Sequence, residues 1–487
     1  MTGVPAAGSG STARISLPAA PCPVDLFRAA GAFFPIEKGG GLVLPESPPA
    51  APGLERRTPG ETDLRVFTTE LPVGRHRLDR SRPRLRVVRD RLTGRTTLRL
   101  VVLVLTGVLV SACSSSGPST GEGGQEAQSG GAGAESLRGV CPATVTIQSS
   151  WFSQVEHFAA YQLLGAGYTV DAARKRVVGP LVSGGVDTGI KIEIRAGGPA
   201  IGFQQVSAQM YADRSITLGM VPLDEAIQNS KDQPVIGVMT PYDVDPLVIM
   251  WDPKTYPDFN TIADIGQTDT RVLFFSGERT YMDYLLGTGQ LRPSQVDGSY
   301  DGSPDRMVAS RGKIAVQGFA TSEPWKWQHE VKAWGKPLTY ALVSDSGYPN
   351  YRNLLAVRAG DRPRLDGCLR RLVPMFQKAT VDFMAEPDPT IDTILSIIGK
   401  TRQPYTDSKA RSQHAVTVMR DNGLVINGRT PMIGDFDLDK GGRVDRLIKI
   451  DVPIFTGQRK QLAPDLTAAR IATNDYLDPT ISLPAGR

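Results

Sequence analysis

The sequence predicts an α/β protein of two lobes, in which each lobe is a largely parallel sheet flanked by helices and two crossovers join the lobes. Three observations predict it. Strand-like and helix-like segments alternate regularly from residue 143, a second series begins at 247–251, and a strand at 353–358 follows that series. Regular alternation of strand and helix produces right-handed βαβ units with parallel strands. The strand at 353–358 need not belong to the second series, so a returning C-terminal segment is expected.

The first series contains four expected strands and three expected helices. Residues 189–195 (GIKIEIR) alternate strictly between apolar and polar side chains, as a half-buried strand does. The other strands are expected at 143–149, 215–221 and 235–239, and the helices at 157–167, 200–212 and 224–229.

The second series repeats the pattern. Its strands are expected at 247–251, 271–276, 313–317 and 338–342, and its helices at 261–265, 280–286 and 323–332. A long helix is expected at 363–386, with helices and irregular connections after it. Lobe 1 is then 140–243 plus 346–487 and lobe 2 is 244–345, with crossovers near 241–246 and 343–351. Ligands bind outside the carboxyl ends of the strands in such sheets, so an interlobe cleft is predicted.

A short apolar run precedes this body. Residues 100–110 (LVVLVLTGVLV) are about half as long as the roughly 20 residues that a membrane-spanning helix needs. An arginine-rich segment precedes the run, and Ser111-Ala112-Cys113 follows it. This pattern predicts an export signal at 87–112. Its end resembles the bacterial lipobox, which implies that Cys113 is lipidated. The alternative is a buried strand, which the Ser/Gly/Pro sequence after Cys113 disfavours.

The segments on either side of the signal are not expected to fold. Residues 1–86 are rich in Pro, Gly, Ala and Arg and have no periodic pattern. We expect them to be a non-native or disordered extension, with translation starting near Val87 or Val88; a genuine cytosolic extension is the alternative. Residues 113–139 are mostly Ser, Gly and Glu, too polar to pack, and are expected to tether the body to the membrane.

The cysteines predict one disulfide. The chain has four, Cys22, Cys113, Cys141 and Cys368. Cys22 lies in the excluded extension and Cys113 is expected to be lipidated, so the exported body retains one pair. An exported protein is in an oxidising environment, and a Cys141–Cys368 disulfide is therefore predicted; two buried free thiols are the alternative.

The composition and motifs argue against several functions. The formal net charge of +5 owes much to the N-terminal segment, and the body has no basic stripe for nucleic acid. The body, 140–487, lacks HExxH, GxSxG, CxxC and P-loop motifs. The body has three histidines, His157, His329 and His414, which do not predict a metal triad. We therefore predict no enzymatic activity, no metal and no cofactor.

Binding signals follow the first strand. Trp151 and Phe152 stand at its carboxyl end, where flat rings stack on planar ligands, although both rings could instead pack in the core. Glu156 and His157 open the next helix and either present a hydrogen-bonding pair to the cleft or cap the helix.

Glycine-bearing turns supply further candidates on both lobes. Gly197 and Gly198 precede a helix in lobe 1, and Ser276 and Gly277 precede one in lobe 2. Glycine permits close backbone approach, and amides at a helix start favour anionic or carbonyl oxygens. Glu323, just beyond the strand at 313–317, is a candidate acceptor for a ligand amine or hydroxyl, or else a helix cap.

Two further candidates complete the set. Asp224 begins the helix at 224–229 and Tyr281 lies on the helix at 280–286.

The segment SWFSQVEHFAAYQLLGAGY (150–168) resembles the W-F-x-x-x-E-H opening of type II periplasmic-type solute-binding proteins, in the branch that holds thiamine-pyrimidine, nitrate and sulfonate binders. AGGP (196–199), LGMVPLDEA (218–226), SEPWKWQ (322–328) and TNDYLDPTIS (473–482) resemble that branch in order. The resemblance covers about 141–487. It implies that Trp151, His157, the Gly198 loop and Glu323 line a cleft. The chain departs from the pattern in an insertion, 171–189, through which the first helix is expected to continue, and at Ser153, where proline is common.

The resemblance implies a lipid-anchored, extracytoplasmic solute receptor that acts as a monomer with an ABC permease and its ATPase. The expected solute is small, planar and nitrogenous, such as a pyrimidine-type vitamin precursor, because Trp151 and Glu323 suit stacking and hydrogen bonding. Nitrate or sulfonate is the alternative within the same fold. An enzyme of the thiamine-pyrimidine-synthase type and a surface lipoprotein with an inactive cleft are alternatives of other classes.

Overall fold

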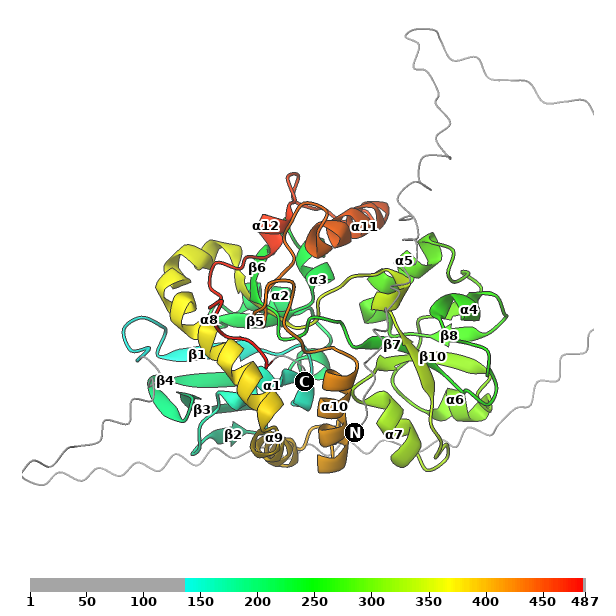
Figure 1. Ribbon diagram of the computed structural model, residues 1–487, viewed down its shortest axis with the longest axis horizontal. Helices are drawn as coiled ribbons and strands as arrows, with labels where there is room; N and C mark the ends of the chain where they lie inside the picture. The colour runs from blue at the N-terminus through cyan, green and yellow to red at the C-terminus, as the bar shows by residue number, and fades with distance from the viewer. Residues whose placement is uncertain (1–135, 485–487) are drawn as a thin grey trace, which may run out of the picture. The chain divides into compact units, whose positions relative to one another are not determined.

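The computed structural model describes residues 136–484, which form two mixed sheets flanked by helices (Figure 1). The expected N-terminal extension, the export signal, Cys113 and most of the tether lie outside the described residues. Within them, no helix has the length and apolarity that crossing a membrane requires.

The larger sheet has seven strands in the order β2-β3-β4-β1-β5-β12-β6. Their bounds are β1 Thr144–Gln148, β2 Thr169–Asp171, β3 Arg176–Ser183, β4 Val186–Arg195, β5 Leu218–Val221, β6 Val235–Met239 and β12 Leu354–Arg358. Strand β1 pairs in parallel with β4 and β5, whereas the pairs at both sides of this centre are antiparallel.

The smaller sheet has five strands in the order β11-β7-β10-β8-β9. Their bounds are β7 Leu247–Trp251, β8 Arg271–Leu273, β9 Val296–Asp297, β10 Ile314–Phe319 and β11 Thr339–Leu342. Its helices are α4 Ile262–Gly266, η4 Ser276–Glu278, α5 Thr280–Gly287, α6 Asp305–Ala309 and α7 Glu323–His329. The predicted α/β fold is thereby confirmed, and the chain passes between the sheets twice, from β6 to β7 and from β11 through η5 (Ser344–Ser346) to β12.

The sheets are less parallel than predicted. Strands β7 and β12 each enter a sheet directly from a crossover, without a helix that would return them in parallel, and both pair antiparallel with their neighbours. The predicted insertion 171–189 forms most of the β2–β3–β4 meander and not a continuation of the first helix. Gly184 and Gly185, both at positive φ, make the two-residue turn between β3 and β4.

Two predicted helices are shorter than expected. The first consists of η2 (Val155–His157) and α1 (Phe158–Gln162), because Leu164 pairs with Leu181 and so leaves the helix. The second is interrupted between η3 (Gly198–Ile201) and α2 (Val206–Ala212), where Gly202 and Phe203 adopt positive φ. The short helix α3 (Leu223–Gln228) follows β5.

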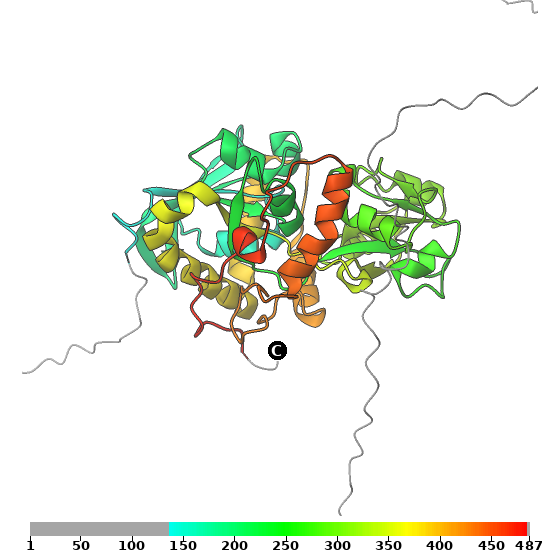
Figure 2. The ribbon, with the colours of Figure 1, turned by 90° about the horizontal axis from the view of Figure 1, so that it is seen from above.

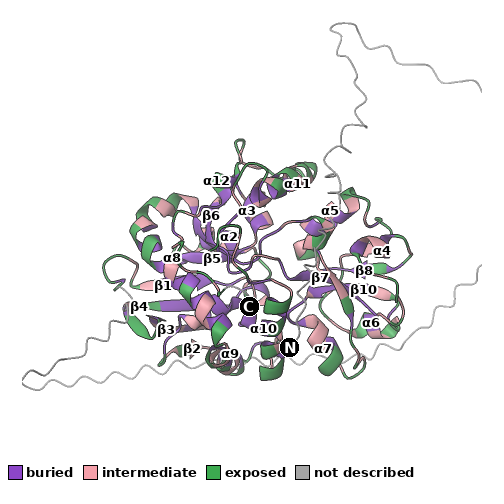
Figure 3. Ribbon diagram, viewed as in Figure 1, coloured by how far each residue is buried: buried purple, intermediate pink, exposed green. Residues whose placement is uncertain are grey.

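The C-terminal helices include two that pack on elements of both sheets. The C-terminal helices are α8 Arg362–Ala385 (after η6, Ala359–Asp361), α9 Asp388–Thr401, α10 Lys409–Asp421, α11 Arg443–Gly457 and α12 Ala468–Ile471. Helix α10 packs on α9 and α7, and α11 packs on α3 and α5, so each contacts helices attached to both sheets (Figures 1 and 2). The central strands of both sheets are buried (Figure 3).

The predicted disulfide is present. Cys141, before β1, is bonded to Cys368 in α8, 227 positions along the chain. On a chain-entropy argument, closing so long a loop contributes roughly 5 kcal/mol by restricting the unfolded chain.

Candidate functional site

Residues attached to the two sheets meet at several contacts, which together we call the seam. It contains an aromatic contact between Trp151, Phe203 and Phe275, a hydrogen bond between Glu156 and Thr321, and an ion pair between Arg352 and Glu278.

The aromatic contact joins the loops that follow three elements. Trp151 follows β1, Phe203 follows η3 and Phe275 follows β8. The centroid of the Trp151 ring is 5.9 Å from that of Phe203 and 6.4 Å from that of Phe275, and those two phenylalanine rings are 5.5 Å apart. The Trp151 ring lies against Gly198, where an added Cβ would be 2.3 Å from it. Glycine at 198 is therefore what allows the Trp151 ring to lie there.

Glu156 is a buried carboxyl at the start of the first helix. Its Oε1 accepts a hydrogen bond from the Thr321 hydroxyl at 2.7 Å, and its Oε2 has no partner among the described residues. Burial raises the pKa of this carboxyl to about 7, while the Thr321 hydrogen bond opposes the rise. Near neutral pH, Glu156 is thus partly protonated and can both accept and donate a hydrogen bond.

His157 lies beside it and is also buried. Its Nε2 is 3.2 Å from the Ser150 hydroxyl, which in turn donates to Asn353 Oδ1 at 2.8 Å. Its Nδ1 has no partner in the described part of the chain. Burial lowers the pKa of the imidazole to about 3, so the ring is neutral at physiological pH. Glu156 and His157 therefore leave two buried polar atoms unsatisfied at neighbouring positions.

Arg352 is the centre of a second polar group. Its Nε donates to Asp245 Oδ1 at 3.1 Å and its terminal nitrogen donates to Glu278 Oε1 at 2.9 Å. Burial lowers the pKa of the guanidinium, but Asp245, Glu278 and Asp224 raise it by more, so the pKa lies above its ordinary value. Asp245 lies in the first crossover and Arg352 in the second, so this pair joins both connections between the lobes.

Gln317, within β10, links this group to the aromatic contact. Its Oε1 accepts hydrogen bonds from the Phe275 amide at 2.8 Å and the Tyr281 hydroxyl at 3.0 Å, and its Nε2 donates to Glu278 Oε2 at 2.5 Å. The aromatic and charged parts of the seam are therefore contiguous.

Several residues singled out in the sequence have contacts within their own lobe. Phe152 is buried beside Trp151, and the Gly197 amide donates to the Trp151 carbonyl. Glu323 Oε2 accepts the Phe319 amide at 2.8 Å, and burial raises the pKa of its carboxyl.

The remaining candidates lie close to the Arg352 group. Asp224 accepts from the Tyr348 hydroxyl at 3.4 Å, and burial raises the pKa of its carboxyl to about 6. Tyr281 is buried against Gln317, whereas Ser276 and Gly277 are exposed on η4. Ser276 lies in η4 and not at the end of a strand, because β8 ends at Leu273.

Sequence reasoning missed several residues that reach the seam, most of them from crossovers and loops: Phe203, Asp245, Phe275, Glu278, Gln317, Thr321, Arg352 and Asn353. Gln317 carried a usable signal, since it is a polar residue directly after the apolar run 314–316. Gly202 carried another, because a glycine before Phe203 marks a helix end.

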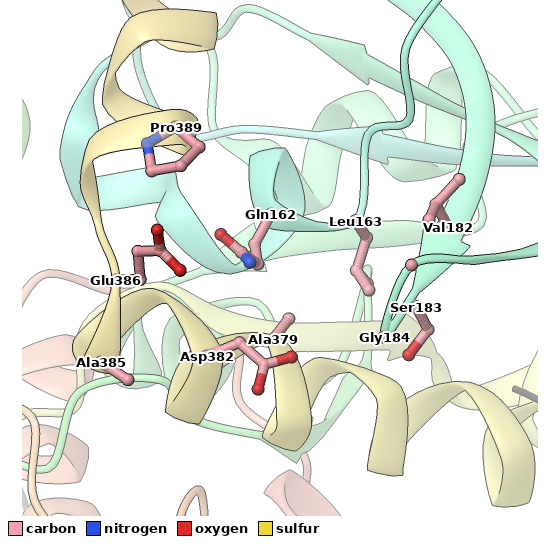
Figure 4. Close-up of a pocket in the computed structure, with 11 residues that line it drawn as sticks. Gln162, Leu163, Val182, Ser183, Gly184, Ala379, Asp382, Ala385, Glu386 and Pro389 are labelled. Carbon is pink, nitrogen blue, oxygen red and sulfur yellow. The ribbon is translucent and has the colours of Figure 1, made fainter. Parts of the chain in front are cut away.

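Two cavities lie elsewhere. One of about 350 Å³ is bordered by α8, the start of α9 and the β3–β4 turn, with Asp382 and Glu386 on its rim (Figure 4). The other, of about 310 Å³, lies between α7 and α10 and is lined by Trp325, His329 and His414. Neither is lined by the residues that make the seam contacts.

Comparisons with known proteins give structural likeness only. No family model and no curated protein matches the chain. The alkanesulfonate-binding protein SsuA of Xanthomonas axonopodis, solved with MOPS, is 14% identical with a TM-score of 0.41, over 68% of this chain and 99% of that one. A putative sulfonate-binding SsuA of Methylobacillus flagellatus is 13% identical with a TM-score of 0.43, over 68% and 92%. The nitrate-binding NrtA of Synechocystis is 12% identical with a TM-score of 0.40, over 69% and 87%. Likeness at this level does not identify a solute.

Proposed function

We propose that the chain is an extracytoplasmic solute-binding receptor of an ABC importer, which captures a small planar nitrogenous compound between its two lobes. One observation carries the proposal: two buried polar atoms on consecutive residues, Glu156 Oε2 and His157 Nδ1, lack partners within the described residues, and Glu156 contacts Thr321 of the other lobe. An unsatisfied buried polar atom costs about 1–3 kcal/mol, which a ligand hydrogen bond would offset.

The fold supports a closing motion. Two crossovers connect the sheets, and proteins of this architecture bind ligands by closing two domains about such connections. A solute that contacts both lobes stabilises the closed arrangement. We propose lobes at 140–243 plus 346–487 and at 244–345.

A pyrimidine-like solute suits the chemistry of the seam. Trp151 supplies an aromatic face, and Glu156, with its pKa near 7, can accept from a ring amine or donate to a ring nitrogen. Nitrate or sulfonate is less well matched, because the Gly197 amide is already bonded and the turns at Gly198 and Ser276 are short 3₁₀ segments. We propose no catalytic role for these residues.

The anchor is a separate part of the proposal. Lipidation of Cys113 and the polar tether after it would hold a monomeric body at the outer face of the membrane, next to its permease and ATPase. Mass spectrometry of the membrane fraction should find an N-terminal, acylated Cys113. An intact Met1 in that fraction would contradict the anchor.

A thermal-shift screen of the full chain against vitamins, pyrimidines, sulfonates and oxyanions tests which class of solute binds. A ligand at a hundred times its Kd adds about 2.7 kcal/mol to the free energy of unfolding. At least one compound should raise the unfolding temperature of the wild type and of Ile426→Ala, at an exposed position outside the seam, but not that of Trp151→Ala. No shift with any compound would overturn the receptor proposal.

A further inference from the structure

We infer that the solute is an organic cation whose charged group binds among the rings of Trp151, Phe203 and Phe275, beside the carboxylates that surround Arg352. The inference rests on the proposed function and narrows the class of solute. It is carried by the ring geometry, by the backbone of Phe203 and by the balance of charge at the seam.

The three rings come from both lobes. Trp151 and Phe203 belong to loops of the larger sheet, and Phe275 to a loop of the smaller one. Their centroids are 5.5–6.4 Å apart and their planes are mutually inclined by 46–82°. Rings that surround a cation from several sides form an aromatic cage, which attracts the cation through the negative faces of the rings.

The backbone of Phe203 adopts a conformation that is unusual for a bulky residue. Its φ is +59°, a conformation that is unfavourable for a bulky side chain, and 56% of its surface is exposed. Its amide donates to the Gly198 carbonyl, which fixes the turn that projects the ring. Outliers of this kind concentrate at functional sites. The ring contacts Trp151 and Phe275 and belongs to neither buried core.

The charged residues next to the cage are predominantly acidic. Glu278 lies on the same 3₁₀ turn that follows Phe275, and Gln317 hydrogen-bonds to both residues. Arg352 interacts with three carboxylates, Asp224, Asp245 and Glu278, so this group carries two negative charges in excess when all three are ionised.

The other titratable groups of the seam add no uncompensated cation. Glu156 and Glu323 are further carboxyls, and His157 is a neutral imidazole. Arg411, on α10, is paired with Asp407 and Glu330. Lys326, on α7, interacts with Glu323. An anionic solute would therefore meet net repulsion, and a cationic one net attraction.

The rings touch one another in this structure, so the cation enters when the lobes separate. Phe275 would then move away from Trp151 and Phe203, and closure would bring it onto the bound ligand. An interaction of this kind contributes most when the cation is desolvated, as it is between closed lobes.

Calorimetric titration of the full chain tests the inference. The probes are choline, tetramethylammonium and N-methylpyridinium. Their matched uncharged controls are 3,3-dimethylbutan-1-ol for choline and toluene for N-methylpyridinium; MOPS and a neutral aminopyrimidine represent the other solute classes. At least one cation should bind, and at least about tenfold more tightly than its uncharged isostere.

Variants separate a binding role of Phe203 from a structural one. Phe203→Gly fits the positive φ, so its unfolding temperature should remain within about 3 °C of the wild type while cation affinity falls about tenfold. Phe203→Tyr keeps an aromatic face and should retain the affinity, and Ile426→Ala should change neither quantity. Equal affinity of Phe203→Gly and wild type for the cation would overturn the cage.

The outcomes distinguish the two proposals. The cation inference is overturned if MOPS or the aminopyrimidine binds and no cation does. It is also overturned if a cation and its uncharged isostere bind equally. In both cases the proposal of a solute receptor stands. If none of these probes binds, the cation inference is overturned. If, in addition, no compound of the thermal-shift screen stabilises the chain, the receptor proposal is overturned as well.

Discussion

The seam has two ends that differ in how well their polar groups are satisfied. Around Arg352, both oxygens of Asp245 and of Glu278 accept hydrogen bonds. Around Glu156, one carboxyl oxygen and one imidazole nitrogen have none from the described residues. The comparison assigns a different role to each end. A hydrogen-bonded ion network can hold the two crossovers together. At unsatisfied polar atoms, a ligand gains the most binding free energy from each hydrogen bond it makes.

The position of the Arg352 group explains its completeness. Asp245 belongs to the first crossover, Arg352 to the second and Glu278 to the smaller sheet's lobe. A buried charge that lost its partner there would be uncompensated, so every member of the group depends on the others.

The largest effect is expected from Arg352→Met. Removing the guanidinium leaves Asp245 and Glu278 without their counter-charge, and the free energy of unfolding should fall by about 3–5 kcal/mol. Urea denaturation measures this loss in the free energy of unfolding. Arg429→Met is the control, because Arg429 makes an exposed ion pair and its loss should cost less than about 1 kcal/mol. Equal losses in both variants would mean that the Arg352 network does not support the crossovers.

The next effect is expected from Glu156→Gln and depends on pH. The carboxyl has a pKa of about 7 in the folded protein, against an ordinary value of 4.5 that it regains in the unfolded chain, so the folded protein binds more protons between these values. The free energy of unfolding of the wild type therefore falls as pH rises from about 4.5 to about 7 and stays reduced above.

Gln keeps an oxygen for Thr321 but cannot ionise, so Glu156→Gln should be more stable than wild type at pH 8, by an amount on the order of 3 kcal/mol, and similar to it at about pH 4.5. Thermal unfolding across this range measures the difference. The exposed Glu386→Gln is the matched control and should change stability little. A difference between Glu156→Gln and wild type that did not vary with pH would contradict the buried, partly protonated carboxyl.

A smaller effect is expected from Thr321→Val. This change removes the hydroxyl that donates to Glu156 across the seam and should lower the free energy of unfolding by about 1–3 kcal/mol. Thr321→Ser, which keeps the hydroxyl, should recover most of the loss. In a Glu156→Ala background, which lacks the acceptor oxygen, the loss should be smaller, because contacting residues are energetically coupled. Strict additivity of the two changes would argue against the contact.

The fold was more predictable than the site, for physical reasons. Strands such as β4 are evident from local alternation, and the crossovers follow from where the two series end. The Gly184-Gly185 turn was an available hairpin signal that was interpreted as part of an insertion. Antiparallel entry of β7 and β12 was not predictable from periodicity, which carries no strand direction.

At the candidate site, Trp151 drew attention because it follows the end of a strand, and Glu156 because it opens the next helix. Their partners were not predictable, since Thr321 is 165 positions from Glu156, and a contact of that range depends on how the lobes pack. Phe203 was assigned to a helix, although the glycine before it marked the break.

Hydrogen–deuterium exchange of the full chain, with and without the compound that stabilises it most, tests the central claim that one solute is held by both lobes. We expect slower exchange in 150–157 and 198–203 of one lobe and in 275–278 and 317–321 of the other, with little change in the outer strands β2 and β9. Protection confined to one lobe, or to the cavity between α7 and α10, would contradict it.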